Sequence, residues 1–154
     1  MSTGLILNAT LLGLGMHPAA WRYRDGPATA YFDPAFFLEV ARTAEDGLLH
    51  AVFLADTLAV NEENFERPNL GAMDPVTVMA LLAGATRRIG LVGTASTTYN
   101  DPYGLARRFQ TLDHLSAGRA GWNVVTTFVP ATAANFGTAE LPEEIGRASC
   151  RERV

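Results

Sequence analysis

Three Asp-Pro dipeptides, each followed by apolar residues at helical spacing, constrain the fold of this chain more than any other feature of its sequence. They are Asp33-Pro34, Asp74-Pro75 and Asp101-Pro102. Aspartate is a favoured N-cap because its side chain accepts a hydrogen bond from a free N–H of the first turn, and proline suits the first helical position. We therefore expect helices that begin at residues 34, 75 and 102, the first of them ending at Gly47.

Short apolar segments precede these helix starts, as the strands of an alternating α/β fold would. We expect strands over residues 5–12, 51–55, 89–95 and 119–125. Two of them are apolar almost throughout, which is typical of strands that are covered on both faces in a parallel sheet. The order β-α-β-α-β-α-β leaves two architectures open, a doubly wound sheet and a (β/α)8 barrel.

Composition and charge narrow the class of protein. With 154 residues, of which 48% are hydrophobic, the chain can form one globular domain with its own core. Its twelve basic residues are all arginines scattered along a chain of net charge −4, which argues against nucleic acid as a partner. No apolar segment approaches the ~20 residues of a membrane helix, and the N-terminus lacks the basic start of a signal peptide. We expect a cytoplasmic protein that binds neither nucleic acid nor membranes.

Residues 144–154 depart from the pattern of the rest of the chain. They hold three arginines within seven residues and the single cysteine, Cys150, and they continue no apolar period. These eleven residues can be read as a translated sequencing adapter, whose next triplet is a stop codon. We interpret residues 1–143 as the authentic domain and residues 144–154 as a non-native tail, the alternative being a solvated basic terminus.

Polar residues gather where the predicted strands end. Asp56 follows the second strand, Thr94 and Ser96 lie at the end of the third, and Asn123 lies at the end of the fourth. In both candidate architectures the carboxyl ends of parallel strands form the ligand-binding edge. We therefore expect these side chains to share one site, although Asp56 could instead cap a loop and the Thr-rich segment could simply lead into a turn.

His17 and Trp21 stand in the loop after the first predicted strand. His17 is either a hydrogen-bond donor that faces a ligand or a loop histidine that fixes its own backbone. Trp21 either walls a pocket or covers the end of the sheet. The three histidines show no ligand spacing, and one cysteine allows neither a disulfide nor a Cys-based metal site, so we predict no metal site.

An ordered set of short segments carries a resemblance to a known family. The segments are FLAD at 53–56, TASTTYNDPY at 94–103, LARRF at 105–109, LDHLS at 112–116 and GRAGWNVVT at 118–126. ANFG near residue 135 fits the same pattern. Together they resemble the nitrilotriacetate monooxygenase component A family of luciferase-like flavin-dependent monooxygenases, over about residues 4–140.

The resemblance implies an α/β fold that is an incomplete (β/α)8 TIM barrel, with the first four strands and three helices in residues 1–143. It implies a two-component monooxygenase that oxygenates a small organic substrate with O₂ and reduced FMN, which a separate NAD(P)H-dependent flavin reductase supplies. It places Asp56, Thr94, Ser96 and Asn123 against FMN. It assigns His17 and Trp21 to the catalytic, substrate-facing side of the ring, and it implies a homo-oligomer for the full-length protein.

The chain is shorter than members of that family, whose FMN-phosphate contacts would lie beyond it. We therefore expect the chain by itself neither to bind FMN tightly nor to turn over. Two alternatives stay open: a non-catalytic half-barrel that binds a partner or a second copy of itself, and a barrel of the same kind that uses deazaflavin for hydride transfer. Segment 94–100 favours FMN through the resemblance alone.

Overall fold

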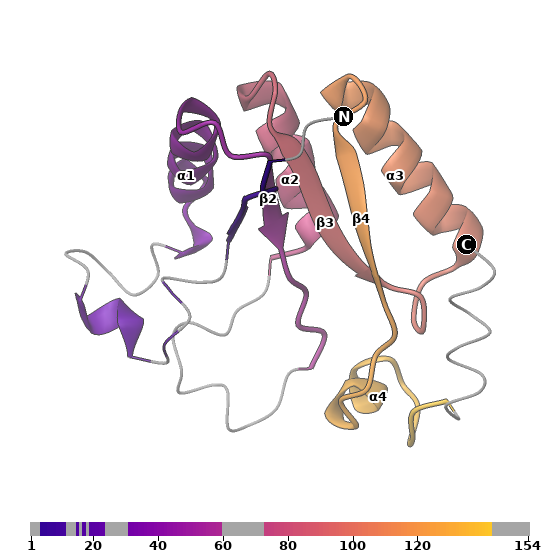
Figure 1. Ribbon diagram of the computed structural model, residues 1–154. Helices are drawn as coiled ribbons and strands as arrows, with labels where there is room; N and C mark the ends of the chain where they lie inside the picture. The colour runs from indigo at the N-terminus through magenta and orange to yellow at the C-terminus, as the bar shows by residue number, and fades with distance from the viewer. Residues whose placement is uncertain are drawn as a thin grey trace.

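The computed structural model describes residues 4–11, 15, 17, 19–23, 31–59 and 73–142, and it contains one four-stranded parallel sheet in the order β1-β2-β3-β4 (Figure 1). The strands are β1 (Asn8–Thr10), β2 (Ala51–Leu54), β3 (Gly90–Ser96) and β4 (Ala120–Val125). The helices that connect them are α1 (Pro34–Asp46), α2 (Pro75–Ala85) and α3 (Pro102–Ser116). Two short helices complete the fold, η1 (Ala20–Tyr23) and α4 (Ala131–Asn135).

The three predicted helix starts are confirmed. Asp33, Asp74 and Asp101 each accept a backbone N–H of the first turn on a carboxylate oxygen, at 2.9, 2.7 and 2.9 Å. A proline follows each of them as the first helical residue, where the missing N–H costs no hydrogen bond. Gly47 ends α1, as predicted. Local side-chain chemistry thus sets where each helix begins.

The structure differs from the sequence prediction at the shortest elements. β1 comprises three residues, whereas a strand over residues 5–12 was expected. Within the described residues it is an edge strand that pairs with β2 alone, and residues 12–14 lie outside that part of the chain. The helices η1 and α4 were not predicted, because four or five residues are too few to show an apolar period.

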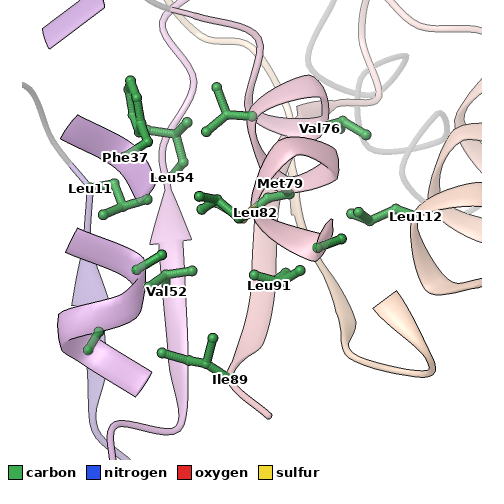
Figure 2. Close-up of a cluster of buried hydrophobic side chains, with 14 of the residues drawn as sticks. Leu11, Phe37, Val52, Leu54, Val76, Met79, Leu82, Ile89, Leu91 and Leu112 are labelled. Atoms are coloured by element: carbon green, nitrogen blue, oxygen red, sulfur yellow. The ribbon is translucent and has the colours of Figure 1, made fainter. Parts of the chain in front are cut away.

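The core lies between the sheet and its three long helices (Figure 2). Val52 of β2 and Leu91 of β3 are both 0% exposed and belong to one cluster with Phe37 of α1 and Met79 and Leu82 of α2. A right-handed crossover between neighbouring parallel strands brings each helix back onto the same face. The opposite face of the sheet therefore has no long helix packed on it within the described residues. In that same part of the chain, no helix combines the length and the apolar character needed to cross a membrane.

Glu45 closes the amino end of the sheet between α1 and β3. One oxygen of its carboxylate accepts the backbone N–H groups of Arg87, Arg88 and Ile89, at 2.8, 2.5 and 3.0 Å. These bonds, led by the one from Arg88, lower the pKa of Glu45 from 4.5 to about 2, against the opposing effect of burial. The ionised carboxylate therefore fixes the turn that leads into β3.

Arg119, directly before β4, stabilises the same end of the sheet. Its guanidinium donates to the carbonyl oxygens of Ser116, Ile89, Ala83 and Thr86 and to the Thr86 hydroxyl, at 2.6 to 3.1 Å. Three of these carbonyls belong to the carboxyl-terminal ends of α2 and α3, where the helix dipole favours a positive charge. Five hydrogen bonds thus tie two helix ends and the start of β3 to one side chain.

Candidate functional site

A cavity of about 290 Å³ lies at the carboxyl end of the sheet. It is formed by the ends of β3 and β4, the segments that follow β2 and β4, and the short helix α4. Its lining residues are Ala55, Asp56, Thr57, Leu58, Ala59, Thr94, Ser96, Asn123, Val125, Thr126, Thr127, Phe128, Val129 and Thr132. The four residues that the sequence placed against a cofactor therefore surround one cavity, although their contact with a ligand stays a prediction.

Thr94 and Asn123 form a cross-strand pair on the wall of this cavity. They are register partners on β3 and β4, and the Asn123 side-chain amide donates to the Thr94 hydroxyl oxygen at 3.0 Å. Because that oxygen is an acceptor in this bond, the hydroxyl hydrogen of Thr94 can be donated to another group. The carbonyl oxygen of Asn123 can in turn accept. The pair thus offers one donor and one acceptor to a ligand.

Ser96 is more deeply engaged with the protein itself. It is 1% exposed, its hydroxyl lies 2.7 Å from that of Thr127, and it accepts the backbone N–H of Thr98 at 3.1 Å. The Thr98 hydroxyl in turn accepts the backbone N–H of Thr127 at 3.0 Å. These bonds join the segments that follow β3 and β4, so Ser96 shapes the cavity and has less hydrogen-bonding capacity left for a ligand than Thr94.

Asp56 lies half-buried at the end of β2, on the lining of the cavity. Burial raises the pKa of its carboxyl group, and the nearby charge of Asp74 raises it further, while a hydrogen bond from the Thr57 N–H acts the other way. The charged form is therefore less stable here than in water. A ligand N–H group that binds this carboxylate would compensate for the lost hydration.

In the described part of the chain, neither His17 nor Trp21 is among the residues that line the cavity. The His17 side chain is exposed, and its Nδ1 accepts the backbone N–H of Ala19 at 3.1 Å, a bond that fixes its own loop. Trp21 belongs to η1, and its side chain lies outside what the structure describes. The substrate-facing roles of both residues stay predictions.

Apolar residues of the segments that follow β2 and β4 also line the cavity. Phe128 and Val129 follow β4, and Leu58 belongs to the segment after β2. The Asn135 side-chain amide of α4 donates to the Leu58 carbonyl at 2.9 Å. A cavity lined by both polar and apolar side chains fits a flat ring that has a polar edge and an apolar face.

Two further buried polar residues line the cavity that the sequence analysis did not single out. Thr127 lies two residues beyond β4 and is 8% exposed, and its place in a run of polar residues after a strand was the available signal. Thr132 is 1% exposed on α4. No sequence signal could have found it, because α4 itself was not predicted.

Comparison with known proteins adds the family to this geometry. Residues 14–150 match the family described as luciferase-like monooxygenase. This chain belongs to the luciferase-like monooxygenase family. It is 48% identical over 131 residues to the N-acetyl-S-(2-succino)cysteine monooxygenase of Bacillus subtilis (strain 168), covering 84% of this chain and 29% of the relative. It is 42% identical over 134 residues to nitrilotriacetate monooxygenase component A of Aminobacter aminovorans, covering 80% and 30%. The predicted resemblance is thereby confirmed.

Solved structures agree with this assignment. The EDTA monooxygenase from Chelativorans sp. BNC1 superposes with a TM-score of 0.86 at 35% identity, covering 95% of this chain and 35% of that one. A riboflavin lyase, solved with modified FMN and its substrate riboflavin, gives a TM-score of 0.78 at 33% identity, covering 95% and 34%. The predicted fold, the first four strands of an incomplete TIM barrel, is confirmed, and the chain spans about a third of these relatives.

Proposed function

We propose that this chain is the part of an FMN-dependent two-component monooxygenase that supplies one wall of the flavin site. The relatives named above as monooxygenases support the reaction class, and the riboflavin lyase structure with modified FMN supports the cofactor. The observation that carries the proposal is the single cavity to which β2, β3 and β4 bring Asp56, Thr94 and Asn123. Since the chain spans 29–30% of the curated relatives, the activity is proposed for the whole protein.

The chemistry of the cavity fits the ring system of FMN. The Thr94 hydroxyl would donate to a ring carbonyl, and the Asn123 carbonyl would accept from a ring N–H. Reduced flavin, when bound, supplies the electrons with which O₂ is activated. The protein's part is to hold the ring by its polar edge and to limit the access of water with apolar lining residues such as Leu58 and Val129.

Further parts of the proposal concern partners and location. A separate NAD(P)H-dependent reductase would supply reduced FMN, and the substrate would be a small organic molecule on the side of His17 and Trp21. Component A in the name of one relative supports a second component. A cytoplasmic location and a homo-oligomeric full-length protein stay predictions, as does the assignment of residues 144–154 to a non-native tail.

Titration of the ¹⁵N-labelled 154-residue chain with FMN tests the proposal. We expect weak binding, with a dissociation constant of roughly 0.1 mM or above, and shifts confined to the amides around Asp56, Thr94 and Asn123. Riboflavin, which lacks the phosphate, should give the same shifts, because the proposed phosphate contacts lie outside this chain. AMP, which has the phosphate but no flavin ring, is the control and should give none.

Two outcomes would contradict the proposal. Flavin-induced shifts located away from the cavity would remove the assigned ring site. Micromolar affinity and turnover with reduced FMN would show instead that the chain needs no further residues.

The Thr94→Val variant sharpens the test, because it keeps the shape of the side chain and removes its hydroxyl. It should weaken flavin binding severalfold, while Thr111→Val on the exposed side of α3 should not.

A further inference from the structure

The hydroxyl group of Thr132, on α4, is buried but has no hydrogen-bond partner within the described residues. The seven buried polar residues in that part of the chain are Thr86, Thr94, Ser96, Thr97, Ser116, Thr127 and Thr132. All but the last take part in at least one side-chain hydrogen bond inside the protein. Thr132 is 1% exposed, so bulk water does not replace the missing partner. A buried hydroxyl that is left unsatisfied lowers stability, and its presence therefore needs an explanation.

The Thr132 hydroxyl keeps contact with the cavity at the carboxyl end of the sheet. Thr132 is one of the residues that line this cavity. Among the described residues, the Tyr99 hydroxyl is the side-chain oxygen that is both unpartnered and fully enclosed, and the Thr132 oxygen does not share that state. The small exposed part of Thr132 therefore faces the cavity. A ligand there could both accept the hydrogen of this hydroxyl and donate to its oxygen.

Thr132 and the pair of Thr94 and Asn123 lie at different depths in the cavity. Thr94 and Asn123 are register partners within β3 and β4, and Asn123 lies two residues before the end of β4, about 7 Å along the strand. The helix α4, which carries Thr132, lies beyond the carboxyl end of β4 (Figure 1). The strand pair thus contacts a part of the ligand that lies along the sheet, and Thr132 contacts a part that extends past the strand ends.

We propose that the Thr132 hydroxyl binds a hydroxyl group of the ribityl chain, which joins the flavin ring to the phosphate. This inference rests on the proposed function, in which Thr94 and Asn123 hold the polar edge of the ring. A ribityl hydroxyl can donate and accept at once, and the Thr132 hydroxyl is free to do both. Thr132 is therefore a binding residue for the chain of the cofactor, outside the ring contacts already assigned.

The same bond would stabilise the start of α4. This helix has five residues, and Pro130 at its N-cap provides no side-chain hydrogen bond. A helix this short is marginal without tertiary contacts. The bond from the Asn135 side chain to the Leu58 carbonyl, at the other end of α4, is exposed to solvent. We therefore expect a flavin that carries the ribityl chain to slow amide exchange in α4, and a flavin without the chain to leave it unchanged.

Two flavins and one substitution test the assignment on the 154-residue chain. Riboflavin carries the ribityl chain, whereas lumiflavin has a methyl group in its place. Titrating the chain into micromolar flavin, followed by flavin fluorescence, gives both dissociation constants. Thr132→Val removes the hydroxyl and keeps the shape of the side chain, so it should weaken riboflavin binding about three- to tenfold and leave lumiflavin binding unchanged. Thr132→Ser, which restores a hydroxyl, should recover most of the loss.

Matched variants separate this contact from the ring site. Thr94→Val should weaken the binding of both flavins by the same factor, and Thr111→Val, at an exposed position on α3, should weaken neither. Hydrogen exchange supplies a second measurement. The amides of Thr132 and Ala133, which bond the carbonyls of Val129 and Pro130, should exchange more slowly with riboflavin than with lumiflavin.

The stability of the flavin-free chain tests the starting observation. Because the Thr132 hydroxyl has no partner in the described protein, Thr132→Val should not lower the urea midpoint of unfolding. Thr94→Val should lower it, since the Asn123 amide loses its acceptor. A clear fall in the midpoint with Thr132→Val would show that the hydroxyl is bonded inside the protein, and the proposal would be overturned.

The remaining binding outcomes also overturn the proposal. Equal weakening of both flavins by Thr132→Val would show that this residue contacts the ring or only shapes the cavity. Unchanged binding of both would show that its hydroxyl contacts no part of the cofactor. If the unaltered chain binds neither flavin, or if Thr94→Val affects neither, the proposed function itself fails, and that result is distinct from one confined to Thr132.

Discussion

The two ends of the sheet use polar side chains in opposite ways. At the amino end, Glu45 accepts three hydrogen bonds and Arg119 donates five, and all but the one to the Thr86 hydroxyl are to backbone groups. At the carboxyl end, Asp56, Thr94 and Asn123 line a cavity and retain capacity for a ligand. Stabilising hydrogen bonds are therefore concentrated at one end, and side chains with hydrogen-bonding capacity to spare line the cavity at the other, a division typical of parallel barrels.

Replacing Arg119 should have the largest effect on this comparison. Arg119→Met keeps much of the side-chain volume but leaves the helix-end carbonyls without their donor. We expect the free energy of unfolding, measured by urea denaturation, to fall by about 3 kcal/mol. Arg42→Met on the exposed side of α1 is the control and should change it by less than about 0.5 kcal/mol. If both variants changed the free energy of unfolding equally, the structural role assigned to Arg119 would be wrong.

Glu45 should contribute less, and its contribution should depend on pH. Glu45→Ala removes the acceptor of three N–H groups and should cost about 1–2 kcal/mol at pH 7. Because the pKa of Glu45 is lowered from 4.5 to about 2, its ionic stabilisation is present above pH 4.5 and is lost as the pH falls toward 2. Unfolding of the native chain and of Glu45→Gln across this range measures it. A stability difference that does not change with pH would contradict the assignment.

Thr94→Val tests the carboxyl end of the sheet in the same way. The half-buried Asn123 amide loses its acceptor, so we expect a loss of about 1 kcal/mol in the free energy of unfolding. The side-chain amide resonances of Asn123 should move at the same time. Thr111→Val, whose hydroxyl bonds only its own helix at an exposed site, should be close to neutral. The pairing of Thr94 with Asn123 is refuted if these resonances stay in place.

Asp56→Asn should change the free energy of unfolding least. It should raise this free energy, whereas Glu45→Gln should lower it. Burial and Asp74 raise the pKa of Asp56, so ionisation costs stability in the fold. That cost is present above the raised pKa and disappears as the pH falls below the ordinary value of 3.8. The variant should thus be slightly more stable than the native chain at pH 7, and the gain should vanish in acid. Thermal unfolding at pH 7 and pH 3 decides this, and a destabilised variant at pH 7 would count against a site kept for ligand binding.

A contact could be predicted from the sequence when its two residues lie close together along the chain. Asp33, Asp74 and Asp101 bond N–H groups two or three positions away, so the helix starts were predictable. The candidate site was predictable because consecutive parallel strands bring their carboxyl ends to one edge. Glu45 is different, since its partners lie 42 to 44 positions further along the chain.

The sequence by itself determined the alternation of strands and helices, the caps, and the set of polar residues that end the strands. Those features depend on hydrogen bonds and apolar periods within a few residues. The tertiary structure alone decided which polar side chains are engaged and which are left available: Ser96 bonds Thr127, whereas Thr94 keeps a hydrogen to donate. It also decided that α4 forms a wall of the cavity. The physical reason is that hydrogen-bond saturation and burial depend on neighbours that only chain folding brings together.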